Sequence, residues 1–138
     1  MKRSAVMSTL LRPPQVFDSF DHFFSLTADG TLSCLGPLMR SAQAPGWLAG
    51  LKTAADTASV HGHVWERHTH GDELLSVVAD HVVVHWCDGE HTSGQEDLPA
   101  GKSLLVPRGL WHRLELLCAS QIFFLTPAQG GEHRKQEV

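Results

Sequence analysis

Histidine is the residue type that stands out in this chain. Ten of the 138 residues are histidine, and four of them fall within ten residues, at His61, His63, His68 and His70. Imidazole nitrogens bind divalent metal ions and exchange protons near neutral pH. Glutamates at positions 66 and 73 lie in the same stretch. The region therefore combines the two side-chain types, imidazole and carboxylate, that most often hold first-row metal ions without sulfur.

Strand periodicity would bring part of this set together. Glu66 and His68 lie two residues apart on a predicted strand, so their side chains point to the same face of the sheet. A short Gly-Asp turn would return the chain and place Glu73 on a neighbouring strand, and His112 begins a later strand after a Pro-x-Gly turn. If these strands line one barrel, two imidazoles and one or two carboxylates converge inside it. Such a set suits a divalent first-row metal with open positions for substrate or oxygen, and it differs from cysteine-based structural zinc sites.

Short strands are predicted for most of the chain after residue 15. Asp29-Gly30 and Asp88-Gly89 each lie where a tight hairpin turn is expected. The predicted strands cover residues 23–26, 31–35, 47–53, 59–66, 74–78, 81–86, 103–106, 112–117 and 121–125. No segment sustains an apolar stripe of helical period for three turns. This pattern favours an all-β sandwich or barrel.

The segment that ends at His112 resembles the second motif of the cupin superfamily. It reads Gly101, five residues, Pro107, one residue, Gly109, two residues and His112. The Asn that often follows in the family is replaced here by Leu116. The resemblance implies a single-domain cupin, which is a double-stranded β-helix or jelly-roll barrel whose two motifs bracket an internal metal site.

The first segment departs from the family pattern of His-x-His, three or four residues, Glu, six residues and Gly. Here Asp80 takes the place of that Gly, with six residues between Glu73 and Asp80. One register pairs His68 with His70 and leaves only two residues before Glu73. The other takes His68 as the second histidine, keeps four intervening residues and puts Glu66 in the first position. We favour the second register, in which His70 lies in the turn.

The favoured register implies a metal site formed by Glu66, His68, Glu73 and His112, holding a divalent ion such as Fe, Mn, Zn or Ni. A carboxylate is a harder Lewis base than an imidazole, so its presence in the ligand set moves the metal preference of the site away from copper. The same change is compatible with a lost metal. Two carboxylates would then repel each other and raise the pKa of one of them. Either glutamate could act as a base in such a site, with His112 as the acid.

Simpler interpretations exist for several of these residues. Glu66 could form an ion pair with Arg67 or Arg108 at the rim of the barrel. The other histidines of the strands and loops, including His81 and His85, are interpreted as ordinary surface or packing residues. The basic residues 133–135 are interpreted as part of a solvated tail.

Composition argues against several classes of protein. Lys and Arg number 11 against 15 Asp and Glu, and the net charge of −4 comes without a basic stripe, so no nucleic-acid partner is expected. Cys34, Cys87 and Cys118 occur singly, which favours a reducing compartment over a disulfide framework. No stretch approaches the roughly 20 apolar residues of a membrane span, and the N-terminal apolar run is too short for a secretory signal. A cytoplasmic protein without a membrane partner is expected.

The length predicts one domain, with an N-terminal tail over residues 1–15, a cupin barrel over 16–130 and a C-terminal tail over 131–138. The resemblance implies a metal-binding enzyme that acts on a small organic molecule, in a superfamily that includes dioxygenases, isomerases and lyases. The alternative is a non-catalytic module that binds or senses a small ligand. Cupins commonly dimerise through N-terminal strands, so the apolar stretch 17–26 predicts a homodimer.

Overall fold

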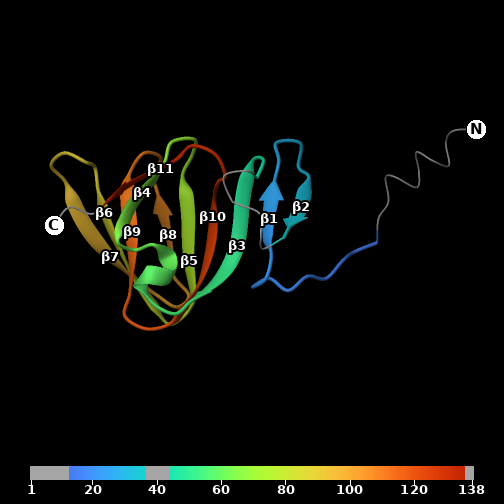
Figure 1. The fold of residues 1–138 in the computed structure, drawn as a ribbon, viewed down its shortest axis with the longest axis horizontal. Coiled ribbons are helices and arrows are strands. Elements are labelled where there is room, and N and C mark those ends of the chain that lie inside the picture. The colour runs from blue at the N-terminus through green and yellow to red at the C-terminus, as the bar shows by residue number, and fades with distance from the viewer. Residues whose placement is uncertain (1–12, 37–43, 136–138) are drawn as a thin grey trace, which may run out of the picture.

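The computed structural model describes residues 13–36 and 44–135, and β-strands dominate these residues (Figure 1). The strands are β1 (Phe23–Leu26), β2 (Leu32–Leu35), β3 (Trp47–Ala54), β4 (Val64–His68), β5 (Glu73–Ala79), β6 (His81–Cys87), β7 (Ser93–Pro99), β8 (Ser103–Val106), β9 (Trp111–Leu116), β10 (Ser120–Pro127) and β11 (Gly131–Lys135). One 3₁₀ helix, η2 (Thr57–Val60), separates β3 from β4. The all-β prediction is confirmed. Within the described ranges, no helix is long and apolar enough to cross a membrane.

The strands form two antiparallel sheets that enclose one main core. The order is β2-β1-β3-β10-β5-β8 in the first sheet and β11-β4-β9-β6-β7 in the second. Both sheets contribute buried apolar side chains to a single cluster, for example Leu75 and Val77 from β5 and Val82 and Val84 from β6. These residues alternate along their strands, as expected for two sheets packed face to face. The four site residues predicted from the sequence lie on strands of both sheets.

Both predicted hairpin turns are present. Gly30 lies between β1 and β2 with φ of 86°, and Gly89 lies between β6 and β7 with φ of 88°. Such positive φ values favour glycine because it has no Cβ. Asp88 completes the second turn, since its carboxylate accepts hydrogen bonds from the backbone N–H groups of three following residues, at 2.8, 3.0 and 3.1 Å. The chemistry of an Asp-Gly pair therefore fixes each turn.

The segment predicted as one strand over residues 59–66 is divided in the structure. Residues 57–60 form η2, and β4 begins only at Val64. Asp56 caps η2, because its carboxylate accepts hydrogen bonds from both the backbone N–H and the hydroxyl of Ser59. His61 ends it in the left-handed region with φ of 53°. Local side-chain hydrogen bonds of this kind compete with strand formation, which is why the strand prediction was wrong here.

Two strands carry no apolar signal in the sequence. The strand β7 pairs with β6 along its whole length, but only Leu98 within it is buried. The strand β11 pairs with β4 although all five of its residues are exposed. Residues 131–135, which were predicted to belong to a C-terminal tail, are therefore part of the second sheet. Of the predicted N-terminal tail, residues 1–12 lie outside the described residues, as do residues 136–138.

Candidate metal centre

Three strands position the four predicted site residues. Glu66 and His68 lie on β4, Glu73 is the first residue of β5, and His112 is the second residue of β9. Among the described residues, β4 and β9 share one register pair, and that pair is Glu66 and His112. Alternation along β4 puts His68 on the same face as Glu66. Register and alternation together bring side chains far apart in the sequence to one place.

Backbone contacts join the two motifs to each other. The N–H of Gly109 donates a hydrogen bond to the carbonyl of His68 at 2.8 Å. The N–H of Arg108 donates to the carboxylate of Asp72, also at 2.8 Å. Gly109 adopts φ of 82°, a left-handed conformation that a side chain would strain. The Pro-x-Gly turn is thus bound to the end of β4 and to the turn before β5, which fixes the distance between the two halves of the site.

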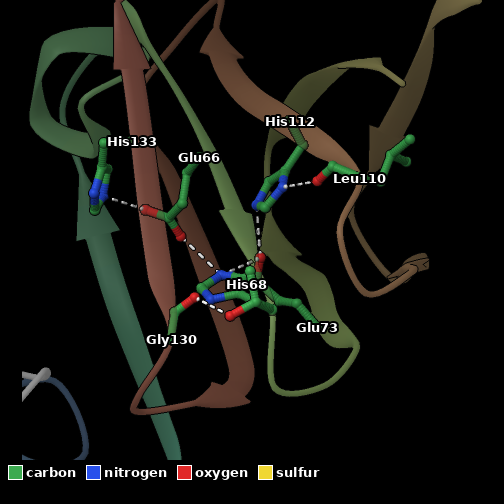
Figure 2. Close-up of polar contacts among 8 residues, drawn as sticks. Glu66, His68, Glu73, Leu110, His112, Gly130 and His133 are labelled. Atoms are coloured by element: carbon green, nitrogen blue, oxygen red, sulfur yellow. Dashed lines mark hydrogen bonds and ion pairs between the residues drawn. The ribbon is translucent and has the colours of Figure 1, made fainter. Parts of the chain in front are cut away.

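The side chains of these four residues form a chain of short contacts (Figure 2). Oε1 of Glu66 lies 2.8 Å from Nε2 of His68, which lies 3.4 Å from Oε1 of Glu73. Nε2 of His112 lies 2.8 Å from the same Glu73 oxygen. One ligand atom from each residue can be chosen such that all four lie within 4.8 Å of one another. His68, Glu73 and His112 are buried, whereas Glu66 lies at the edge with 37% of its side chain exposed.

Contacts between unlike charges outweigh burial in setting the pKa values of the cluster. Burial would raise the pKa of Glu66, yet the imidazole of His68 lowers it to about 2. Burial would lower the pKa of His68, yet the carboxylates of Glu66 and Glu73 raise it to about 9. The pKa of Glu73 is lowered and that of His112 is raised, in each case because their mutual contact overcomes burial. The expectation that a carboxylate pKa rises in the metal-free site was wrong, because each carboxylate faces an imidazole.

Several buried atoms of the cluster lack a hydrogen-bond partner. In the part of the chain that the structure describes, this holds for both ring nitrogens of His68 and for Oε1 of Glu73. The contacts between them have the distances of ion pairs, but their geometry is not that of hydrogen bonds. Buried polar atoms without partners cost free energy, and a bound cation would satisfy one ring nitrogen of His68 and Oε1 of Glu73. Two imidazole nitrogens and two carboxylate oxygens fit Fe, Mn, Zn or Ni.

A hydrogen bond from the second ring nitrogen of His112, Nδ1, orients its imidazole ring. Nδ1 lies 3.4 Å from the carbonyl oxygen of Leu110, and because a carbonyl only accepts, Nδ1 is the donor in this long hydrogen bond. In a neutral imidazole, Nε2 then carries the lone pair and faces Glu73. Metal-binding histidines typically have such a partner, which fixes the tautomer and the ring orientation.

His70 lies outside the cluster. It follows β4 on an exposed turn, and its carbonyl accepts a hydrogen bond from the Arg108 guanidinium at 3.3 Å. The alternative in which Glu66 pairs with Arg67 or Arg108 finds no support among the described residues, since Arg67 pairs with Glu132 at 2.6 Å and Glu66 contacts His68 and His133. The structure therefore brings Glu66 together with His68, Glu73 and His112, and His70 lies in the turn.

Sequence reasoning missed His133, which contacts the cluster from outside. His133 lies on β11 directly opposite Glu66 in the β4–β11 register, and its Nε2 lies 3.1 Å from Oε2 of Glu66 (Figure 2). A carboxylate only accepts, so the imidazole donates this hydrogen bond. No apolar pattern marks β11, and the contact follows only from strand pairing. Residues 133–135 are exposed, as expected, but they belong to a strand that pairs with β4 rather than to a tail.

A cavity of about 690 Å³ lies beside the cluster, with Glu66, His68 and Glu73 in its wall. The rest of the wall is mainly apolar and includes Phe23, Leu48, Leu75, Leu114, Ile122 and Phe124. One lysine, Lys52, also lines it. Volumes of about 300–1,000 Å³ with apolar walls and a few polar groups are typical of small-molecule sites. Neither Lys52 nor this cavity was predicted from the sequence.

Comparison with known proteins yields matches in structure only. No protein-family model and no curated protein sequence matches the chain. The protein BH2720 from Bacillus halodurans is similar in structure over 90% of this chain and 89% of that chain, with 18% identity and a TM-score of 0.52. A cupin-2 domain containing protein from Shewanella frigidimarina matches over 59% and 70%, with 17% identity and a TM-score of 0.44.

A further match is hydroxypropylphosphonic acid epoxidase from S. wedmorenis. It covers 61% of this chain and 44% of the epoxidase chain, with 17% identity and a TM-score of 0.49, so this chain spans less than half of that enzyme. At these identities the likenesses concern the fold alone. The two facing antiparallel sheets agree with the predicted jelly-roll fold, and the match to BH2720 extends over nearly the whole chain.

Proposed function

We propose that this chain is a cupin that binds a divalent metal ion and acts as an enzyme on a small organic molecule. The ligands in this proposal are Glu66, His68, Glu73 and His112. The observation that carries it is the convergence of four nitrogen and oxygen donors, three of them on buried residues. Glu66, His68 and Glu73 of this set also lie in the wall of a cavity of about 690 Å³.

The chain's own residues have distinct tasks in this proposal. Glu66 and Glu73 balance the charge of the ion, and His68 and His112 supply neutral nitrogen donors. The carbonyl of Leu110 holds the His112 ring in place. Apolar side chains of the cavity exclude water and bind the carbon skeleton of the substrate. A bound ion of this kind would act as a Lewis acid on an oxygen atom of the substrate.

A module that binds a small ligand without metal or turnover is the second candidate. The pKa values of the cluster favour it. The raised pKa of His68 keeps its imidazole protonated at neutral pH, and the lowered pKa of Glu66 keeps its carboxylate ionised, so the two charges balance without a metal ion. The cavity is available to a ligand in either case. Metal content separates the two candidates.

Metal analysis of the purified protein tests the proposal. We expect wild type, reconstituted with Zn, Mn, Ni or Fe(II), to hold about one equivalent, as an intact structural or catalytic site does. His112→Ala should lose the metal and Glu66→Gln should bind it more weakly, whereas His70→Ala, altered on the exposed turn, should retain it. Wild type with less than about a tenth of an equivalent of every metal after reconstitution would exclude a metalloenzyme and leave the ligand-binding module.

A further inference from the structure

Lys52 occupies an inward position on β3. Along this strand the buried residues Leu48, Gly50 and Ala54 alternate with more exposed ones. Lys52 is two residues from both Gly50 and Ala54, so its side chain points to the same inward face of the sheet. Its partner across the sheet is Ile122 of β10, which is also buried. The lysine side chain therefore extends into the cavity whose wall includes Glu66, His68 and Glu73.

The ammonium group of Lys52 is only partly satisfied. Its Nζ donates one hydrogen bond, to the carbonyl of Ser59 at 2.8 Å, and no carboxylate among the described residues lies within ion-pair distance. An ammonium group has three N–H donors, so two remain for a ligand. Burial lowers the pKa of Lys52, while the charge of Glu66 opposes that shift and favours the cation. A half-buried cation with a single neutral acceptor is stabilised by an anion beside it.

The charges of the site add up to a preference for a monoanion. Two ionised carboxylates, those of Glu66 and Glu73, balance one divalent cation. Lys52 then leaves the cavity with one positive charge. A ligand with a single negative charge restores neutrality, whereas a neutral ligand leaves the ammonium unpaired and a dianion brings an excess of negative charge.

The apolar part of the remaining wall suits a carbon skeleton attached to that anion. The Phe23 and Phe124 rings, 5.5 Å apart in an edge-to-face arrangement, form part of it. Gly50 makes room for them, because a Cβ there would lie 2.6 Å from the Phe23 ring and 3.1 Å from that of Phe124. Aromatic and aliphatic surfaces of this kind bind the carbon skeleton of a ligand without selecting its polar groups.

We propose that the cavity binds a small monoanionic carboxylic acid with an apolar body, and that Lys52 is the residue that selects the carboxylate. This inference rests on the proposed function, because the charge balance includes the bound divalent ion. Lys52 acts as a specificity-determining residue. It is distant in sequence from the four ligands and leaves the metal site itself unchanged.

Ligand titrations of the zinc-loaded protein, followed by NMR, test the inference with phenylacetate and its neutral analogue phenylacetamide as probes. We expect wild type to bind phenylacetate about tenfold more tightly than phenylacetamide, as for a charge-assisted hydrogen bond. Lys52→Met keeps the length of the side chain and removes its charge. It should lower phenylacetate affinity about tenfold, leave phenylacetamide affinity unchanged and retain full zinc content. Lys52→Arg should preserve the preference.

Lys102→Met is the matched control, since Lys102 is exposed on the turn before β8. It should bind both probes as wild type does. Equal phenylacetate affinity in Lys52→Met and wild type, with full zinc in both, would overturn the role of Lys52 and leave the proposed function standing. Wild type without zinc would overturn the proposed function and this inference with it. The two failures are therefore distinguishable by zinc content.

Discussion

The two oxygens of Glu66 are held by different histidines. Oε1 lies 2.8 Å from Nε2 of His68 on the same strand, and Oε2 accepts a hydrogen bond of 3.1 Å from His133 on β11. His133 thus fixes the orientation of the most exposed carboxylate in the cluster. A contact of this kind raises metal affinity through the ligand that it orients.

Replacing His133 with Ala should therefore weaken zinc binding about tenfold, because Glu66 loses the donor that orients it. Competition with a chromophoric chelator measures this change. His133→Gln, which can still donate a hydrogen bond, should recover part of the affinity. Lys135→Ala on the same exposed strand is the control and should bind zinc as wild type does. Equal affinity in His133→Ala and wild type would show that Glu66 needs no support from β11.

The buried contact between Glu73 and His112 should matter far more for stability than a surface contact of equal length. Both this contact and that between Glu115 and His85 measure 2.8 Å, but the Glu73 side chain is 8% exposed and that of Glu115 is 43% exposed. In the metal-free protein, Glu73→Gln should lower the free energy of unfolding by about 3 kcal/mol, since it leaves buried imidazoles without a counter-charge. Glu115→Gln should cost less than about 1 kcal/mol. Urea denaturation of both variants makes the comparison, and equal losses would refute it.

Metal binding should strengthen as the pH rises from 7 to 9. Neighbouring carboxylates overcome burial and raise the pKa of His68 from 6.5 to about 9, so the metal-free site holds a proton at neutral pH that a metal must displace. Calorimetry at pH 7 in buffers of different ionisation enthalpy should detect the released proton. A zinc affinity that does not change with pH over this range would contradict the raised pKa.

The same pKa predicts the pH dependence of folding in the absence of metal. The pKa of His68 is higher in the folded state than in the unfolded chain. Its contribution to stability is therefore fully present below about pH 6.5 and is lost as the pH rises through 9. The urea midpoint of the metal-free protein should fall over this interval, and it should fall less in His68→Gln.

Asp80 occupies a position that suits glycine better. It joins β5 to β6 with φ of 71°, in the left-handed region that aspartate tolerates and most other side chains avoid. Asp80→Gly should stabilise the fold by about 0.5 kcal/mol, and Asp80→Val should destabilise it by about 1–2 kcal/mol. Asp80→Asn, which accepts the same conformation, should change stability little. Thermal unfolding of the three variants gives the order Gly, Asn, Val, and any other order would contradict the role of the backbone angle.

Dimerisation through the N-terminal strands stays a prediction. The strand β2 lies at the end of its sheet, and Leu32 on it is 67% exposed, close to the exposed Phe17 and Phe20 in sequence. Exposed apolar side chains beside an unpaired strand edge favour association. Sedimentation at micromolar concentration should give a dimer for wild type and a monomer for Leu32→Lys. Leu117→Lys, equally exposed at 66% but after β9, should remain dimeric. A monomeric wild type would refute the prediction.

The sequence predicted the parts of the site whose residues leave a local pattern. Gly109 and His112 belong to a spaced motif, and the strand alternation of Glu66 and His68 follows from their separation by two residues. The choice between Glu66 and His70 could be argued from spacing because the length of a turn is a local property. The hairpins at Asp29 and Asp88 could be predicted for the same reason.

What the sequence did not predict depends on pairing between distant strands. His133 reaches Glu66 only because β11 pairs with β4, and β11 shows no apolar alternation because all of its residues are exposed. Lys52 is a single charged residue in an apolar strand, and its inward direction follows from the series of buried neighbours. Periodicity reports burial and local conformation, so exposed edge strands leave no trace in it.

The pairing of β11 with β4 also bears on the order in which the protein is made and folded. Glu66 and His133 are 67 residues apart in the chain, and Thr69 and Gly130, joined by a hydrogen bond of 2.8 Å, are 61 apart. A nascent chain that has emerged from the ribosome only as far as β9 contains all four proposed ligands. It still lacks β11, whose His133 donates a hydrogen bond to Glu66. Contacts of such long range form slowly, because the loop between them must close first. We therefore expect metal loading to follow synthesis of β11 rather than to nucleate the fold.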